Sequence, residues 1–318
     1  MLNAQTTQAL RDYCVTLKGY LEKTPLTPQK QQAIEARLVQ LIMEGADPNL
    51  SVQDGVSTPL IFLTVQYNLL TTLAVLMTAG VDLNVQDAVG MRVLHTAAIY
   101  GHADVIQKLL EARVSVHTPL EQNGMTALHF AALNGHQAVV EQLIAAGADV
   151  NTRDARGYTA LYYAAGLYLN NAQPPVGIID CLLAAGADLN VQNEKGHTPL
   201  YQAVNAERLD IVKLLVGRGA EVPAALSRAK ELFQFYHRKF SDTCYIGSPE
   251  ARQDEERRYA TTIQVVTVLE EALLLGPKKL VQAPAPFVQP QYVQAQHAVP
   301  VSRATPFTCQ AVAPVLKW

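Results

Sequence analysis

Apolar residues recur in short helical patterns between glycines along the middle of the chain. The stretch from Gly124 to Asn151, GMTALHFAALNGHQAVVEQLIAAGADVN, is the most regular. Its spacing predicts two short helices on either side of Gly135. Isolated helices shorter than about 12–15 residues are marginal in water, so neither helix can stand alone. The unit must therefore bury its apolar faces against similar units.

Copies of this unit occur before and after it. The clear copies open at Gly90, Gly124, Gly157 and Gly196, and a corresponding leucine follows each at Leu94, Leu128, Leu161 and Leu200. A degenerate copy places Leu60 at the same position, so the intervals run from 33 to 39 residues. Repeats of this period indicate an array in which each unit packs on its neighbours.

The repeated phrases TALHFAA, TPLYQAV, the GH turns and LLAAGADLN resemble the ankyrin repeat over about residues 28–222. That family folds as helix–turn–helix followed by a β-turn finger. The resemblance implies an all-α ankyrin-repeat solenoid of about five repeats, with helical caps and a disordered C-terminal tail. The sequence departs from the family pattern at a few places, namely Arg92-Val93 in place of Thr-Pro, Tyr162 and Tyr201 in place of the family histidine, and one extra residue after Gly55.

The chain divides into four predicted segments. Residues 1–52 form an N-terminal helical cap and partial repeat, with helices over 5–23 and 28–44, the second capped by Thr27. Residues 53–222 hold the ankyrin repeats. Residues 223–275 form a C-terminal helical pair, which is read as a divergent sixth repeat or cap, with an unrelated helical hairpin as the alternative. Residues 276–318 are rich in Pro, Gln, Ala and Val and form a disordered tail.

Three local features refine this picture. Repeat four carries extra residues between its helices, from Tyr168 to Pro175, which predict a protruding loop. Repeat two has Arg113 where glycine normally supplies the left-handed residue that ends a helix, so we expect a distorted turn there. In the last helix, over 250–275, the predicted apolar stripe is Ile263, Val266, Leu269 and Leu273.

Composition and charge limit the classes of partner and site that we expect. The net charge of −3 with scattered Lys and Arg gives no electrostatic footprint for nucleic acid. No run of 18 apolar residues and no signal peptide is present, so we expect no membrane partner. The four cysteines lie far apart, without metal-type spacing, and fit a reducing compartment. We therefore expect a cytoplasmic monomer without cofactor or metal.

Two histidine pairs, His95 with His102 and His129 with His136, have seven-residue spacing that could suggest metal ligands. The resemblance implies a different role, in which these histidines bind loop backbone and tie neighbouring repeats together. No sequence motif of an NTPase, a dinucleotide-binding fold, a hydrolase or a metalloprotease is present. The chain is therefore predicted not to be an enzyme.

Aromatic residues give the strongest prediction of a site. On the family pattern, the residue after the histidine position points into the concave groove, and the residue after each opening glycine lies on the finger. Tyrosine is a favoured interface anchor, because it supplies a large area at little entropy cost. The predicted partner-binding residues are Tyr100, Met125, Phe130, Arg156, Tyr158, Tyr163, Tyr168 and Gln202.

The sequence thus predicts a non-enzymatic protein–protein interaction module that binds a protein or peptide on the concave groove. Three alternatives stay open. Tyr163 and Tyr168 could instead pack the inserted loop. The chain could be a microbial effector that binds a host protein in the host cytosol. Segment 223–275 could hold a small enzymatic module, for which the sequence offers only His237, Asp242 and Cys244.

Overall fold

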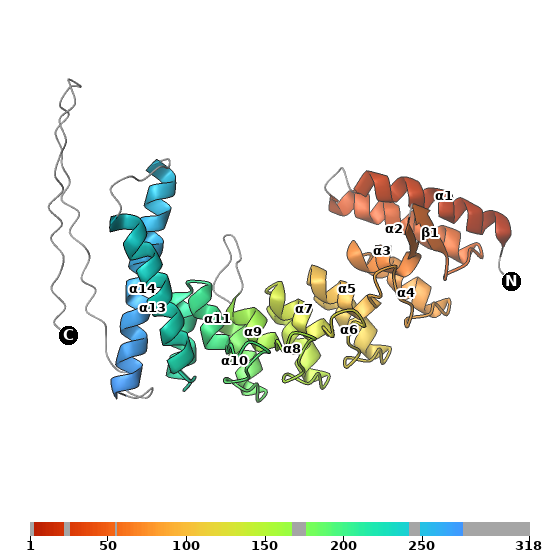
Figure 1. Ribbon diagram of the computed structural model, residues 1–318. Coiled ribbons are helices and arrows are strands. Elements are labelled where there is room, and N and C mark those ends of the chain that lie inside the picture. The colour runs from red at the N-terminus through yellow and green to blue at the C-terminus, as the bar shows by residue number, and fades with distance from the viewer. Residues whose placement is uncertain (1–2, 22–25, 55, 167–175, 242–248, 276–318) are drawn as a thin grey trace, which may run out of the picture. The chain divides into compact units, whose positions relative to one another are not determined.

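The computed structural model describes residues 3–21, 26–54, 56–166, 176–241 and 249–275 (Figure 1). This part of the chain folds into fourteen helices and one pair of short strands. The predicted tail over 276–318 lies outside the described residues, as does the whole inserted loop of repeat four from Tyr168 to Pro175.

Five helical pairs follow one another along the middle of the chain. They are α3 (Leu60–Gln66) with α4 (Leu70–Thr78), α5 (Val93–Tyr100) with α6 (Ala103–Glu111), α7 (Ala127–Leu133) with α8 (Gln137–Ala145), α9 (Ala160–Ala165) with α10 (Val176–Ala184), and α11 (Pro199–Asn205) with α12 (Leu209–Gly217). The first helix of each pair packs on the first helix of the next, and α6, α8 and α10 pack in the same order. We call α3, α5, α7, α9 and α11 the inner helices (Figure 1).

Small and branched apolar side chains hold this array together. Each clear repeat buries its leucine, Leu94, Leu128, Leu161 or Leu200, in one continuous core. Alanines such as Ala131 and Ala164 are fully buried on the inner helices and let adjacent backbones approach closely. Each short helix is stabilised mainly by this burial, which contributes roughly 25 cal/mol per Å² of apolar surface removed from water.

Repeat one differs from the predicted register by one residue. The turn after α3 is closed by the hydrogen bond from Leu69 N to Thr64 O, and the matching bonds in repeats two and three run from His102 N to Ala97 O and from His136 N to Ala131 O. Counting back from these bonds places Ile61, and not Leu60, at the position of Leu94 and Leu128. The prediction for Leu60 was therefore wrong, and Leu60 packs in a separate N-terminal cluster.

The turn at Arg113 keeps its regular form, contrary to the expected distortion. Arg113 adopts a left-handed φ of 61°, close to the 81° and 88° of Gly80 and Gly147 at the equivalent places. The hydrogen bond from Val114 N to Leu109 O matches the bond from Ala148 N to Leu143 O in repeat three. Arg113 therefore adopts the left-handed conformation that glycine adopts in the other repeats, and the turn is preserved.

The N-terminal segment adds two helices and a hairpin. Helix α1 (Ala4–Leu21) packs on α2 (Pro28–Met43), and α2 packs on α4. Thr27 caps α2 as predicted, since its hydroxyl accepts a hydrogen bond from Lys30 N at 3.4 Å. Strands β1 (Ser51–Asp54) and β2 (Val56–Pro59) pair antiparallel immediately before α3. The sequence pattern did not predict these strands.

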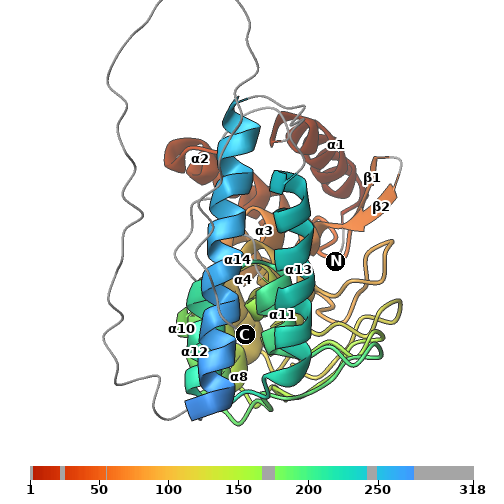
Figure 2. The ribbon, with the colours of Figure 1, turned by 60° about the vertical axis from the view of Figure 1, so that its left-hand side comes forward.

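The C-terminal helices continue the stacking. Helix α13 (Pro223–Ser241) packs on α11 and α14 (Pro249–Leu275) packs on α12, while α13 and α14 lie side by side (Figure 2). The predicted stripe on α14 is partly wrong. Val265, Leu269 and Ala272 are buried, whereas Ile263 and Leu273 are exposed.

Candidate functional site

In repeats two and three, the histidine that follows the repeat's leucine connects the repeat to the loop after it. His129 is buried on α7, and its Nδ1 accepts hydrogen bonds from the backbone N–H of Thr126 at 3.0 Å and from the Thr126 hydroxyl at 2.9 Å. Its Nε2 therefore carries the proton and donates to Thr152 O and Tyr158 O, both at 3.1 Å. His95 makes the same kind of connection to Arg92 N and Thr118 O.

The histidine in the GH turn reaches back to the preceding repeat. His102 Nε2 lies 3.0 Å from Gln66 O, and His136 Nε2 lies 2.9 Å from Ile99 O. Gly101 leaves room for the His136 ring, because a Cβ there would lie 2.4 Å from the ring nitrogen. All four histidines thus tie neighbouring repeats through backbone carbonyls, as the family resemblance implied.

Repeat four carries a compact aromatic cluster at the base of its finger. The rings of Tyr158 and Tyr162 are stacked with centroids 4.3 Å apart, and Tyr163 meets Tyr158 edge-on at 5.7 Å. The Tyr162 hydroxyl donates to Gln202 Oε1 of repeat five at 3.1 Å. The cluster therefore joins repeats four and five.

Asp154 fixes the finger beside this cluster. Its buried carboxylate accepts backbone N–H bonds from Arg156 at 2.9 Å and Tyr158 at 2.8 Å through Oδ1. The Tyr163 hydroxyl donates to Oδ2 at 2.6 Å. Burial, followed by this bond and the charge of Asp154, raises the pKa of Tyr163, so the phenol stays protonated as a donor.

Several of the predicted site residues lie close together. Tyr158, Tyr163 and Gln202 belong to the cluster, and Met125 lies beneath it, only 6% exposed, with its sulfur 3.9 Å from the Tyr163 hydroxyl. Met125 thus presents little surface to a partner. Arg156 is exposed on the finger.

The remaining predicted residues lie elsewhere. Phe130 is half-buried and meets His95 edge-on at 5.8 Å. Tyr100 stands at the end of α5, 45% exposed, and stacks on His102. Sequence reasoning did not select Tyr162, although its replacement of the family histidine was the signal that could have identified it.

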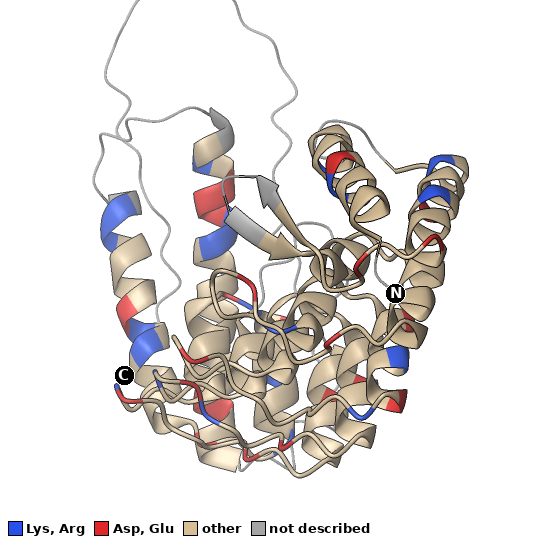
Figure 3. Ribbon diagram, turned by 90° about the vertical axis from the view of Figure 1, so that its right-hand side faces the viewer, with Lys and Arg blue, Asp and Glu red and all other residues tan. Residues whose placement is uncertain are grey.

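The inner helices share one further property. No Lys, Arg, Asp or Glu occurs in any of the five, from α3 to α11. Figure 3 shows many of the charged residues on loops and on the terminal helices instead. Two large apolar side chains are nevertheless exposed at the ends of adjacent inner helices, Tyr100 on α5 and Leu133 on α7, the latter 37% exposed. Leu133 was not among the predicted site residues.

Comparison with known families agrees with this architecture. A family model described as ankyrin repeats (three copies) matches residues 31–119, 61–154, 115–174 and 152–225. These matches run without a gap from 31 to 225, which is more than half of the 318 residues. The chain belongs to the ankyrin-repeat family. A search of curated proteins finds no matching relative.

Ankyrin repeats generally mediate protein–protein interaction. Metal binding or membrane insertion would require particular side-chain clusters or helices in addition to the repeats. Among the described residues, no group of three or more His, Cys, Asp and Glu side chains could hold a metal ion. No helix in the same part of this ankyrin-repeat protein is both long and apolar enough to cross a membrane.

The enzymatic alternative rested on three residues in segment 223–275. Asp242 and Cys244 lie outside the described residues. His237 is exposed on α13, and its Nδ1 lies 3.1 Å from the Tyr259 hydroxyl of α14. The described contacts of His237 thus join the two C-terminal helices.

Proposed function

We propose that this ankyrin-repeat protein recognises an apolar segment of a protein partner on the face formed by its inner helices. The observation that carries the proposal is the absence of formally charged residues from all five inner helices. Burying an unpaired charge at an interface is costly, and interface cores are accordingly depleted of charge. Because the inner helices carry no charged residue, an apolar partner can cover them without that cost.

Tyr100 and Leu133 supply candidate anchors for this contact. They stand on adjacent packed helices and are both substantially exposed. Phe130, half-buried on α7, adds an aromatic edge to the same helix as Leu133. Tyrosine is among the residue types enriched at binding hot spots, and aromatic residues in general are enriched in interface cores.

The finger of repeat four provides a rigid border. Asp154 holds its backbone through two hydrogen bonds and is itself held by the Tyr163 hydroxyl, which limits the entropy that would be lost on binding. Arg156 is exposed on this finger, and Lys195 and Glu194 are exposed on the next one. A polar border around an apolar centre is the usual anatomy of an interface.

Affinity capture with charge-bearing variants tests the proposal. The double variant Tyr100→Glu/Leu133→Glu places two carboxylates on the inner helices at exposed positions. We expect proteins captured specifically by the wild-type chain to be reduced by about tenfold or more, since loss of interface anchors costs over 1–2 kcal/mol. Quantitative mass spectrometry of the captured proteins measures the reduction.

The control is Gln107→Glu, which adds a carboxylate at an exposed position of α6, outside the inner helices. It should retain the captured proteins. Circular dichroism and the melting temperature establish that each variant is folded. Equal capture by the double variant and the wild type would refute binding through the inner helices.

A further inference from the structure

Helix α13 packs on α11 as the next helix in the inner row, but it extends further. It has 19 residues, whereas α5 has eight and α11 has seven. The buried Tyr236 donates its hydroxyl to Glu207 Oε1 at 2.7 Å, and Glu207 lies in the turn between α11 and α12. Tyr236 is thus level with the turn that joins α11 to α12, and the residues of α13 after Tyr236 extend beyond that turn.

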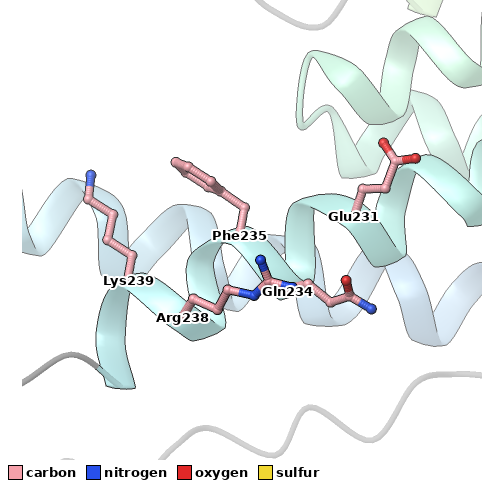
Figure 4. A pocket seen from close by; sticks show the side chains of 5 residues that line it. All are labelled: Glu231, Gln234, Phe235, Arg238 and Lys239. Atoms are coloured by element: carbon pink, nitrogen blue, oxygen red, sulfur yellow. The ribbon is translucent and has the colours of Figure 1, made fainter.

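One face of α13 is open between Glu231 and Lys239. Glu231, Gln234, Phe235, Arg238 and Lys239 follow one another at helical spacing and line a hollow of about 350 Å³ (Figure 4). We call these five residues the α13 stripe. Phe235 lies at its centre with 58% of its surface exposed, against the edge of the Tyr236 ring at 5.3 Å. Lys239 Nζ lies 6.0 Å from the centre of the Phe235 ring.

Two of the three charged residues in the stripe form ion pairs with other side chains. Glu231 accepts from Arg228 Nη1 at 3.0 Å, and Lys239 is paired with Glu255 of α14. Within the described residues, no carboxylate forms an ion pair with Arg238. The stripe thus presents an exposed aromatic ring and, three residues further along the helix, a guanidinium without an ion-pair partner among the described side chains.

We propose that the α13 stripe is a second docking surface of this protein, and that its occupant is an acidic peptide segment of a protein partner with one apolar side chain. The apolar side chain would cover Phe235 in the hollow. A carboxylate would pair with Arg238, whose planar guanidinium can form two parallel hydrogen bonds with it. Aromatic residues, phenylalanine included, and arginine are enriched in protein interfaces.

This surface differs in chemistry from the inner helices. The inner helices carry no formally charged residue, whereas the α13 stripe carries two cations, Arg238 and Lys239, and one carboxylate, Glu231. The inference therefore does not depend on the function proposed above. The variant Tyr100→Glu/Leu133→Glu should leave binding to the stripe unchanged.

Selection of short random peptides displayed on phage, with the full chain as bait, tests the proposal. We expect the selected peptides to be enriched in Asp and Glu around a Phe, Trp or Leu. Phe235→Ala and Arg238→Glu should each lower the affinity of a selected synthetic peptide by about tenfold or more, the range of an interface hot spot. Titration by fluorescence anisotropy measures the affinity.

Lys213→Glu is the matched control, because it makes the same charge change at an exposed position of α12. It should bind the peptide like the wild type. The proposal is overturned if the selected peptides show no acidic enrichment, or if Arg238→Glu and Lys213→Glu bind them equally. Binding to vesicles that contain phosphatidylserine, without selection of acidic peptides, would also overturn it and assign the cations to a lipid surface.

Discussion

Arg113 holds a backbone conformation that an L-amino acid rarely adopts. Its φ of 61° stands where repeats one, three, four and five have glycine. The left-handed conformation costs a residue with a Cβ roughly 1–2 kcal/mol, and glycine recovers part of this despite its greater freedom in the unfolded chain. We expect Arg113→Gly to stabilise the protein by about 1 kcal/mol, raising the melting temperature by about 2–4 °C.

Calorimetry or thermal denaturation followed by circular dichroism measures this change. Arg113→Ala is the control, because it removes the same exposed side chain but keeps the Cβ and hence the strain. If alanine stabilises the protein as much as glycine, the effect belongs to the arginine side chain and not to the backbone.

Individual residues show how far sequence reasoning reaches. The four histidines make their predicted contacts, because the position of each in the ankyrin repeat determines both where its side chain lies and which backbone carbonyl it contacts. Met125 illustrates the limit. Its position on the finger suggested exposure, but Tyr163 covers it, since that tyrosine turns toward Asp154. A pairwise contact of this kind depends on residues 38 and nine positions apart, which no local pattern encodes.

The inner helices α5 and α7 depend on neutral histidines for their connections. Burial lowers the pKa of His95 and His129, with smaller opposing effects from carbonyl bonds and nearby Asp87 and Asp154. A proton on Nδ1 would oppose the backbone N–H that now donates to it. The unfolded chain, with histidine pKa near 6.5, therefore binds more protons than the folded chain below that pH.

Acidification should therefore destabilise the folded chain. The free energy of unfolding should stay constant above about pH 7 and fall as the pH decreases from about 6.5 toward the lowered folded pKa. Urea denaturation between about pH 7.5 and 5.5 measures this fall, in a range where most carboxylates remain ionised. His95→Tyr/His129→Tyr, which copies the residue of repeats four and five, should lose less stability on acidification. An unchanged acid dependence in this variant would exclude these histidines as its cause.

Whole elements were predicted more accurately than their registers. Both helices of every repeat follow from apolar periodicity between glycines, because each helix buries one face in a shared core. The register of α3 was wrong by one residue, since the extra residue after Gly55 is taken up where β2 runs into the helix. Helix α14 has so many apolar residues that more than one helical face could have been the buried one. Its packing on α12 determines that Val265 is buried and Ile263 is exposed.

At the scale of the whole array, a line of asparagines links successive fingers. Asn49 Oδ1 accepts from Asp82 N at 2.9 Å, Asn151 from Asp188 N at 2.8 Å, and Asn190 from Glu221 N at 2.9 Å. Repeat two has Ser115 and His117 where repeats one, three and four have Asp and Asn. In this described stretch, no such bond joins Asn84 to Ser115 or His117 to Asp149.

Repeat two therefore lacks this asparagine hydrogen bond on both sides, although His102 and His136 still tie it to its neighbours. In a repeat array, stability is approximately the sum of unit and interface contributions, so a weak interface opens first. We expect the backbone amides of Ser115 and Asp149 to exchange with deuterium much faster than those of Asp82, Asp188 and Glu221. The helices α5 and α6 should likewise exchange faster than α7 and α8.

Restoring the missing link tests this reasoning directly. His117→Asn supplies the side-chain oxygen that Asp149 N lacks, and a net gain of about 0.5–1.5 kcal/mol is typical of one hydrogen bond. The amide of Asp149 should become protected to the level of Asp188, and exchange across α5 and α6 should slow because their link to repeat three is strengthened. His117→Ala provides the comparison, since it removes the imidazole without adding an acceptor. Protection that rises equally in both variants would show that the histidine itself, and not the absent hydrogen bond, weakens the array at repeat two.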